Sequence, residues 1–219
     1  MLELGSFDNG VSMPVPSFNI HGVLPPYIGP NGPGGAPSDM SPYEATVLEV
    51  VAHFSSTAER RAILRDWLQH RSEMGARGVV HGFQWIDGSF VEDKVPADID
   101  VITYFRRPQG HESDVAIGTL FLNEADVFRR APIKARLKVD AMFVDLDSPP
   151  ESVVLQTRYY GSLFSHRRGD DLWKGMVSVP IDHANDGVAI ALLDALDGRA
   201  NPVADEHQDA DIAVEDAGT

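Results

Sequence analysis

Apolar residues recur at two different spacings along the 219-residue chain, and these spacings predict its helices and strands. Segments 41–54 and 56–75 have apolar residues three and four positions apart, as one buried face of a helix requires. In the first segment, Ser41, Pro42 and Glu44 match a capping box that opens a helix. The residues predicted to face the core are Val47, Val50, Val51, Phe54, Ile63, Leu64, Trp67 and Leu68.

The second of these helices is expected to start at Ser56 or Thr57 and to end at Gly75 and Gly78. Beyond it, short apolar runs predict buried strands, and helical spacing returns between them. The predicted strands cover 79–86, 98–105, 137–146 and 174–181, and the predicted helices cover 123–130, 150–164 and 182–196. This mixture predicts an α+β fold, with a mixed β-sheet flanked by helices.

The two ends of the chain differ in composition from its middle. Residues 24–37 hold five prolines and four glycines, which predicts that 1–40 form an extended arm that wraps the core or is partly disordered. Residues 197–219 hold seven acidic residues and one arginine, so 198–219 are expected to form an acidic, disordered tail. One domain, 41–197, is left between the arm and the tail.

The net charge of −15 argues against binding of an extended nucleic acid, because phosphate contacts require Lys and Arg. The sequence shows neither a basic and apolar leader nor a long apolar run, so a cytoplasmic protein that does not enter a membrane is expected. It contains no cysteine, and its eight histidines lack metal-ligand spacing, so zinc is not expected.

The segment 85–101, WIDGSFVEDKVPADIDV, contains the main candidates for functional residues. Asp98 and Asp100 are two residues apart in a predicted strand, so their side chains project from the same face. Two adjacent carboxylates repel each other unless a cation lies between them, and Mg²⁺ prefers such oxygen ligands. Gly88 and Ser89 follow an apolar strand, where backbone N–H groups and a hydroxyl can bind phosphate.

A third carboxylate is expected from the strand over 137–146. Asp140 and Asp145 are both candidates, and their odd spacing puts them on opposite faces, so only one can join the site. Asp140 is preferred because it lies near the start of its strand, as Asp98 and Asp100 do.

Basic side chains further along the chain are candidates for phosphate binding. Arg167, Arg168 and Lys174 lie in and after a Gly-Asp loop, where they can either neutralise phosphates or form a solvated turn.

These motifs resemble the polymerase-β-like nucleotidyltransferase superfamily, and most closely an uncharacterised bacterial family with a nucleotidyltransferase-like core. The segments that carry this closer resemblance span about residues 18–181: FNIHGVLPP, SPYEA, GFQWIDGSFVE, PADIDVITYF and WKGMVSVP. The resemblance implies a nucleotidyltransferase-like sheet in which Asp98, Asp100 and Asp140 bind Mg²⁺ or Mn²⁺ and carry catalysis. It also implies that Gly88 and Ser89 hold a nucleoside triphosphate such as ATP.

The implied activity is transfer of a nucleoside monophosphate from a nucleoside triphosphate to a hydroxyl group. Two alternatives stay open. The first is a catalytically inactive module of the same fold that acts through a partner protein, as in toxin–antitoxin or defence systems. The second is a metal-dependent glycosyltransferase, since Asp-x-Asp also occurs in enzymes that bind nucleotide-sugars.

Overall fold

The computed structural model describes residues 15–200 and consists of one mixed five-stranded sheet with helices on both faces. The α+β expectation is thereby confirmed. The strands are β1 (Tyr43–Glu44), β2 (Gly82–Asp87), β3 (Ile99–Phe105), β4 (Val139–Asp145) and β5 (Val177–Pro180), in the spatial order β1-β5-β2-β3-β4. β3 and β4 run parallel, whereas β2 is antiparallel to both of its neighbours.

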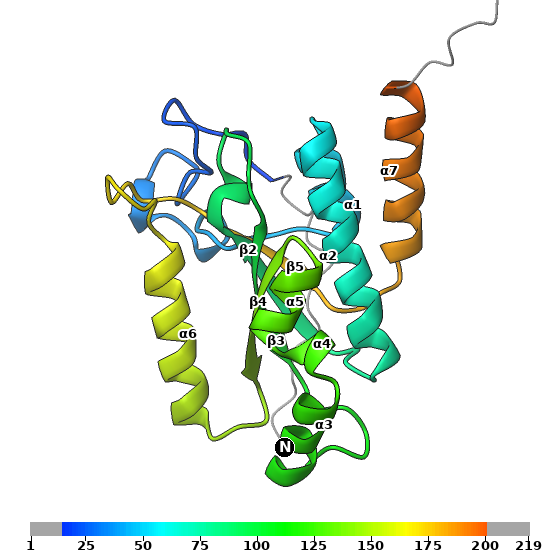
Figure 1. The fold of residues 1–219 in the computed structure, drawn as a ribbon. Coiled ribbons are helices and arrows are strands. Elements are labelled where there is room, and N and C mark those ends of the chain that lie inside the picture. Colours follow the sequence, from blue (N-terminus) through cyan, green and yellow to red (C-terminus); the bar gives the residue numbers. More distant parts are fainter. Residues whose placement is uncertain (1–14, 201–219) are drawn as a thin grey trace, which may run out of the picture.

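Seven α-helices occur in the described part of the chain. They are α1 (Val47–Phe54), α2 (Ala58–Ala76), α3 (Asp114–Asn123), α4 (Ala125–Phe128), α5 (Arg130–Arg136), α6 (Pro150–Phe164) and α7 (Asp186–Ala200). Short 3-10 helices are η1 (Gly32–Gly34), η2 (Pro37–Asp39) and η3 (Gly88–Val91). Figure 1 shows α1, α2 and α7 together on one side of the sheet and α6 alone on the other.

Alternation along β3 assigns its side chains to these two faces. Ile99 and Val101 join the core formed with α1, α2 and α7, while Ile102 and Tyr104 join a smaller cluster with Phe164 of α6. Since side chains alternate along a strand, Asp100 projects toward the face that α6 covers.

The first helix begins later than predicted. The backbone N–H of Tyr43 donates to Met176 O (2.9 Å), so the segment after Ser41-Pro42 forms strand β1 instead of a first helical turn. The helix is capped by Thr46, whose hydroxyl accepts from Glu49 N while the Glu49 carboxylate accepts from Thr46 N. Ser41 and Glu44 have the same spacing, but only the second pair directly precedes an unbroken apolar stripe.

The other predicted elements agree closely with the structure, apart from their ends. Thr57 caps α2, and the eight residues predicted to face the core in α1 and α2 are buried. The helices α3 and α5 had no counterpart among the predicted elements. Ser113 caps α3 through a bond from Ala116 N (3.2 Å), and Pro132 lies in the first turn of α5.

The described part of the arm packs on the domain. Val15, Val23 and Leu24 are buried, Leu24 O accepts from Gly175 N (2.8 Å), and Val23 bridges to Glu92. The described part of the arm therefore contacts the core of the domain. The first fourteen residues of the predicted arm and the predicted tail from 201 onward lie outside the described residues.

No helix within residues 15–200 combines the length and apolar composition that crossing a bilayer requires.

Candidate functional site

Three aspartates form a row across adjacent strands at one end of the sheet. Asp87 of β2 pairs in register with Asp100 of β3, and Asp100 pairs in register with Asp140 of β4. Neighbouring strands lie about 4.8 Å apart, and residues in register project to the same face. Asp98 immediately precedes β3, two residues before Asp100. The three predicted acids therefore lie at one end of β3 and β4, and Asp87 extends the row.

Gly88 allows the turn after β2 to approach this row closely. Its φ is +75°, and a Cβ on it would lie 1.7 Å from Asp100 Oδ2. Any other residue would be strained in this conformation and would also collide with the carboxylate. Ser89 is half-buried in the same turn, and its hydroxyl makes no hydrogen bond to other described residues. The glycine thus brings the backbone of the turn up to Asp100.

Two basic side chains of α5 reach the acidic row. Lys134 Nζ lies 2.8 Å from Asp98 Oδ2 and 2.6 Å from Asp140 Oδ2. Arg130 donates to both carboxylate oxygens of Asp140, and its Nη2 lies 2.8 Å from Oδ2. Burial opposes ionisation of Asp140, but the bonds from Arg130 and Lys134 outweigh it and hold the pKa of Asp140 below its ordinary value. Asp140 is therefore an ionised, buried carboxylate.

Asp100 differs from its neighbours because no cation among the described residues forms an ion pair with it. Burial raises the pKa of Asp100 to about 6, and the negative charges of Asp98 and Asp140 add to the effect. A carboxylate crowded by like charges in this way favours a cation that it does not yet have.

A divalent ion such as Mg²⁺ needs several oxygen ligands, and the acids near the Gly88 turn offer carboxylate oxygens. Asp98 and Asp100 offer oxygens on one side of one strand, as Mg²⁺ requires, and Asp100 has no cation partner. Across residues 15–200, however, no group of three or more histidine, aspartate or glutamate side chains is arranged to hold a metal ion. The contacts of Arg130 and Lys134 with Asp140 are consistent with that finding. Of these three acids, Asp100 is thus the one that no cation among the described residues pairs with, whereas Asp98 and Asp140 share Lys134.

Lys174 lies beneath the Gly88–Ser89 turn. Its side chain is 4% exposed, and Nζ lies 2.7 Å from Gly88 O and 3.1 Å from both Glu92 Oε1 and Asp87 Oδ1. Asp87 is fully buried, and neither of its oxygens has a hydrogen bond of good geometry despite this ion-pair distance. Burial raises the pKa of Asp87 to about 8, and Lys174 only partly opposes that rise. Lys174 therefore contacts protein groups within the site.

The other predicted residues lie elsewhere. Arg167 pairs with Asp170 and donates to His21 O (2.8 Å), and Arg168 is exposed. Neither contacts the three acids. Asp145, the alternative third acid, lies at the opposite end of β4 from Asp140 and pairs with Arg107 (2.7 Å). The structure thus places Asp140 beside Asp100 and leaves Asp145 away from the site.

Sequence reasoning missed Asp87, Arg130 and Lys134. The alternation of β2 could have placed Asp87, because Trp85 lies two residues before it and belongs to the cluster on the α6 face. Arg130 and Lys134 have the i, i+4 spacing of one helical face, but nothing in the sequence indicates which acids they meet.

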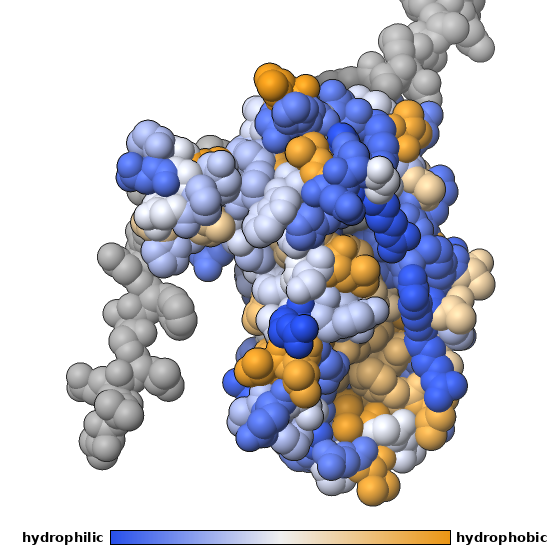
Figure 2. Space-filling model, turned by 90° about the vertical axis from the view of Figure 1, so that its left-hand side faces the viewer, coloured by the Kyte–Doolittle hydropathy of each residue, from blue (hydrophilic) through white to orange (hydrophobic). Residues whose placement is uncertain are grey.

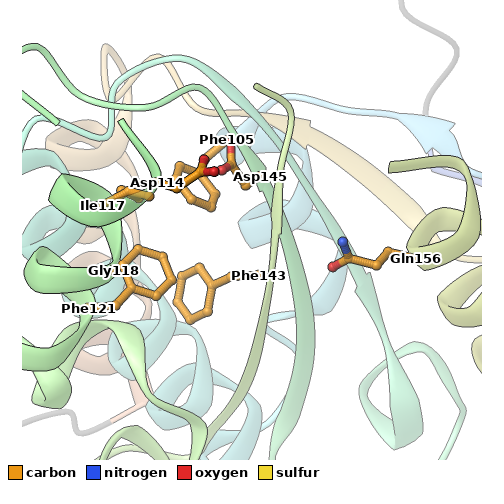
Figure 3. Close-up of a pocket in the computed structure, with 8 residues that line it drawn as sticks. All are labelled: Phe105, Asp114, Ile117, Gly118, Phe121, Phe143, Asp145 and Gln156. Carbon is orange, nitrogen blue, oxygen red and sulfur yellow. The ribbon is translucent and has the colours of Figure 1, made fainter. Parts of the chain in front are cut away.

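A separate pocket lies at the other end of β3 and β4. Its volume is about 210 Å³, and Figure 3 shows Phe105, Phe121 and Phe143 on its walls, with Asp145 near Phe105. Five residues of strand separate Asp140 from Asp145, which corresponds to about 17 Å. The pocket is therefore distinct from the acidic row.

Helix α6 covers the face from which the acids project, and it does so thinly. Of its residues, only Phe164 is buried, while Val154, Leu155, Tyr159 and Leu163 are exposed on its outer side. Figure 2, which faces this side of the molecule, shows hydrophobic residues among hydrophilic ones. The nearby α5 side chains keep solvent contact, since the Arg130 side chain is 64% exposed. Next to it, the side chain of Asp98 is 23% exposed, whereas that of Asp140 is 3% exposed.

The fold and the site define an α+β protein with clustered carboxylates next to a glycine turn. The chain belongs to a family of unknown function, DUF6932, whose model matches residues 16–180. No curated protein and no solved structure matches the chain.

Proposed function

We propose that this protein is a Mg²⁺-dependent nucleotidyltransferase, which moves a nucleoside monophosphate from a nucleoside triphosphate to a hydroxyl acceptor. The observation that carries the proposal is the position of Asp98, Asp100 and Asp140 beside the Gly88 turn. Carboxylates from neighbouring strands next to a close-approaching backbone are what phosphoryl transfer through bound cations needs.

Each residue has a role that its position supports. Asp98 and Asp100 hold Mg²⁺ or Mn²⁺, which when bound neutralises negative charge on the phosphates. Asp140 completes the carboxylate set and orients Arg130 and Lys134. The backbone N–H groups of Gly88 and Ser89, with the Ser89 hydroxyl, face the phosphates. Lys174 supports this turn from below through Gly88 O (2.7 Å).

In the proposed reaction, the acceptor oxygen forms a bond to the α-phosphorus, and the bond from that phosphorus to the bridging oxygen breaks. Pyrophosphate leaves, and the proton of the acceptor hydroxyl passes to a carboxylate of the site. The chain's contribution is to position the two reactants and to neutralise their charge.

One observation favours a second candidate, an inactive module of the same fold. Lys134 and Arg130 already neutralise Asp98 and Asp140, so the ion pairs stabilise the domain without a metal ion. In such a module the acids would serve the fold alone, and function would depend on a partner protein.

A labelling experiment separates the two candidates. The protein is incubated with each α-labelled nucleoside triphosphate and Mg²⁺ or Mn²⁺, with cell extract as the source of acceptor. We expect label transfer by the wild type and none by Asp98→Asn or Asp100→Asn, because both variants lose charge but keep their volume. Asp145→Asn is the matched control, since it removes an ion-paired aspartate from the same sheet. Absence of transfer from every nucleotide would favour the inactive module.

A further inference from the structure

The pocket with Phe105, Phe121 and Phe143 on its walls, the aromatic pocket below, lies where two parallel strands end. β3 and β4 are neighbours, and they end there at Phe105 and Asp145. The chain leaves β3 toward α3, which shares a cluster with Met74 of α2, and leaves β4 toward α6, on the opposite face of the sheet. Connections that depart to opposite faces open a crevice at the carboxyl ends of the strands, and open sheets bind ligands in such crevices.

The walls of the aromatic pocket have the size and character of a small-molecule site. Phe121 and Phe143 are half-buried, and their ring centroids lie 5.5 Å apart at an interplanar angle of 71°. Phe105 adds a third ring, 5.6 Å from that of Phe121. The volume of about 210 Å³ exceeds the roughly 150 Å³ of a dry apolar cavity that binds benzene. The pocket therefore has room for one six-membered ring with a short substituent.

Gly118 of α3 leaves space beside these rings. It lies within a ten-residue helix, and a Cβ built on it would meet nothing within 4 Å. Alanine is the better helix former, so the helix itself does not require a glycine here. Gly161 of α6 is equally unobstructed, but it is not among the residues that line the pocket. A larger side chain at 118 would therefore fill the pocket, whereas one at 161 would not.

The polar groups around the pocket favour an uncharged ligand. Arg107 Nη2 lies 2.6 Å from Asp114 Oδ1 and 2.7 Å from Asp145 Oδ2, so both lining carboxylates already have a cation. The Gln156 side chain makes no hydrogen bond to other described residues, and Figure 3 shows its amide turned toward the aromatic side chains. A charged ligand would bring an unmatched charge against apolar rings, whereas a neutral polar group can bond to the amide.

We propose that the aromatic pocket binds a small uncharged aromatic compound that carries one hydroxyl or similar hydrogen-bonding group. The ring of the ligand packs on Phe105, Phe121 and Phe143, and its polar group bonds to the Gln156 amide. Apolar walls with a few placed polar groups are typical of small-molecule sites. The pocket lies at the other end of β3 and β4 from the acidic row and needs no metal ion, so this inference is independent of the proposed function.

Titration of the isotope-labelled full-length protein with benzyl alcohol, followed through its backbone amide NMR shifts, tests the site. Gly118→Leu fills the pocket, and Gln156→Met removes the amide but keeps the length of the side chain. Gly161→Leu is the matched control, because it makes the same change in a helix at a position that does not line the pocket. Circular dichroism checks that each variant is folded.

We expect benzyl alcohol to bind the wild type with a dissociation constant of about 1–10 mM, as suits a one-ring ligand, and to shift the amides of 117–121 most. Gly118→Leu should bind it at least about tenfold more weakly, and Gly161→Leu should stay within about twofold of the wild type. Gln156→Met should lose several-fold in affinity for benzyl alcohol, but none for toluene, which has no hydroxyl group.

Charged probes of the same size test the ligand class. Benzoate should bind at least about tenfold more weakly than benzyl alcohol, because carboxylates flank the pocket. Benzylamine should bind no more tightly than benzyl alcohol, because Arg107 already neutralises those carboxylates. Tighter binding of benzylamine would overturn the assignment to uncharged compounds.

Two further results would overturn the site itself. One is the absence of saturable shifts at 117–121, and the other is equal affinity of Gly118→Leu and the wild type for benzyl alcohol. If Gly118→Leu does not fold, the ratio of the affinities for benzyl alcohol and toluene in Gln156→Met decides, and an unchanged ratio contradicts the proposal. No metal ion is added, so none of these outcomes bears on the acidic row.

Discussion

Strand β4 has an aspartate at each end, and both aspartates are paired with basic side chains. Asp140 meets Arg130 and Lys134, and Asp145 meets Arg107 (2.7 Å). The surrounding charges are also alike. Asp98, Asp100 and Asp140 lie near two cations, and Asp114, Asp145 and Asp147 lie near Arg106 and Arg107. Counting charges does not distinguish the two ends.

Pairing and burial do distinguish them. At the Asp145 end, each of these three acids contacts an arginine directly, and the Asp114 side chain is 89% exposed. At the Asp140 end, Asp100 forms no ion pair within residues 15–200, although it lies in register between Asp87 and Asp140. Crowded acids with an unmet charge on fixed strands are the ones to which the proposed function assigns the metal ion. Acids that are each matched by an arginine at a solvated rim indicate a structural cluster.

The largest expected effect comes from neutralising the aspartate at one end of β4 and comparing it with the same change at the other end. Asp140→Asn should reduce nucleotide transfer by at least about a hundredfold, because charge stabilisation at a metal-dependent site contributes several kcal/mol. Asp145→Asn should stay within about twofold of the wild type, since it lies away from the reacting groups. Initial rates with an α-labelled nucleotide measure both. Equal losses in the two variants would show that the row at the Asp140 end has no special role.

Two glycines provide a comparison of stability. Gly88→Ala should lower the free energy of unfolding by about 2 kcal/mol or more, because its backbone is left-handed and its Cβ would meet Asp100 Oδ2 at 1.7 Å. Gly118 lies in α3, beside the other end of the strands, and a Cβ there meets nothing within 4 Å. Gly118→Ala should therefore raise the free energy of unfolding by about 0.5–1 kcal/mol. Urea titration measures both changes, and a tolerated Gly88→Ala would contradict the close approach.

The sequence predicted the strands well enough to place Asp98 and Asp100 on one face, since alternation is a local property. The choice between Asp140 and Asp145 depended on which end of β4 meets the start of β3. That is a matter of register between strands about forty residues apart, and local patterns do not contain it.

Arg130 and Lys134 were missed for a related reason. Their spacing is visible in the sequence, but their partners are set by the packing of α5 against β4. The predicted helix start at Ser41 failed because two capping-box patterns lie five residues apart, and pairing with β5 determined which segment became a strand.

The pH dependence of stability separates Asp100 from Asp145. The pKa of Asp100 is raised from 3.8 to about 6 in the folded protein, so between these values the folded state binds more protons than the unfolded one. The contribution of Asp100 to stability therefore falls as the pH rises from about 4 to 6, and its unfavourable effect is complete above pH 6.

Asp100→Asn removes this effect and should stabilise the metal-free protein at pH 7 by about 1–3 kcal/mol, with little gain at pH 4. Asp145→Asn should destabilise by about 0.5–1 kcal/mol, because it loses the pair with Arg107. Urea titrations at several pH values test the difference in sign. A loss of stability in Asp100→Asn at pH 7 would mean that the carboxylate is satisfied within the fold.

The central claim is that the unmet charge around Asp100 is a site for a divalent cation, and thermal unfolding with and without Mg²⁺ tests it most directly. At pH 7 and with Mg²⁺ at about ten times its dissociation constant, the wild-type melting temperature should rise by about 3–6 °C, as expected for a stabilisation of about 1.4 kcal/mol. The rise should be smaller at pH 5, where protons compete for Asp100. It should vanish in Asp100→Asn and persist in Asp145→Asn. An unchanged wild-type melting temperature, or an equal rise in Asp100→Asn, would contradict the claim.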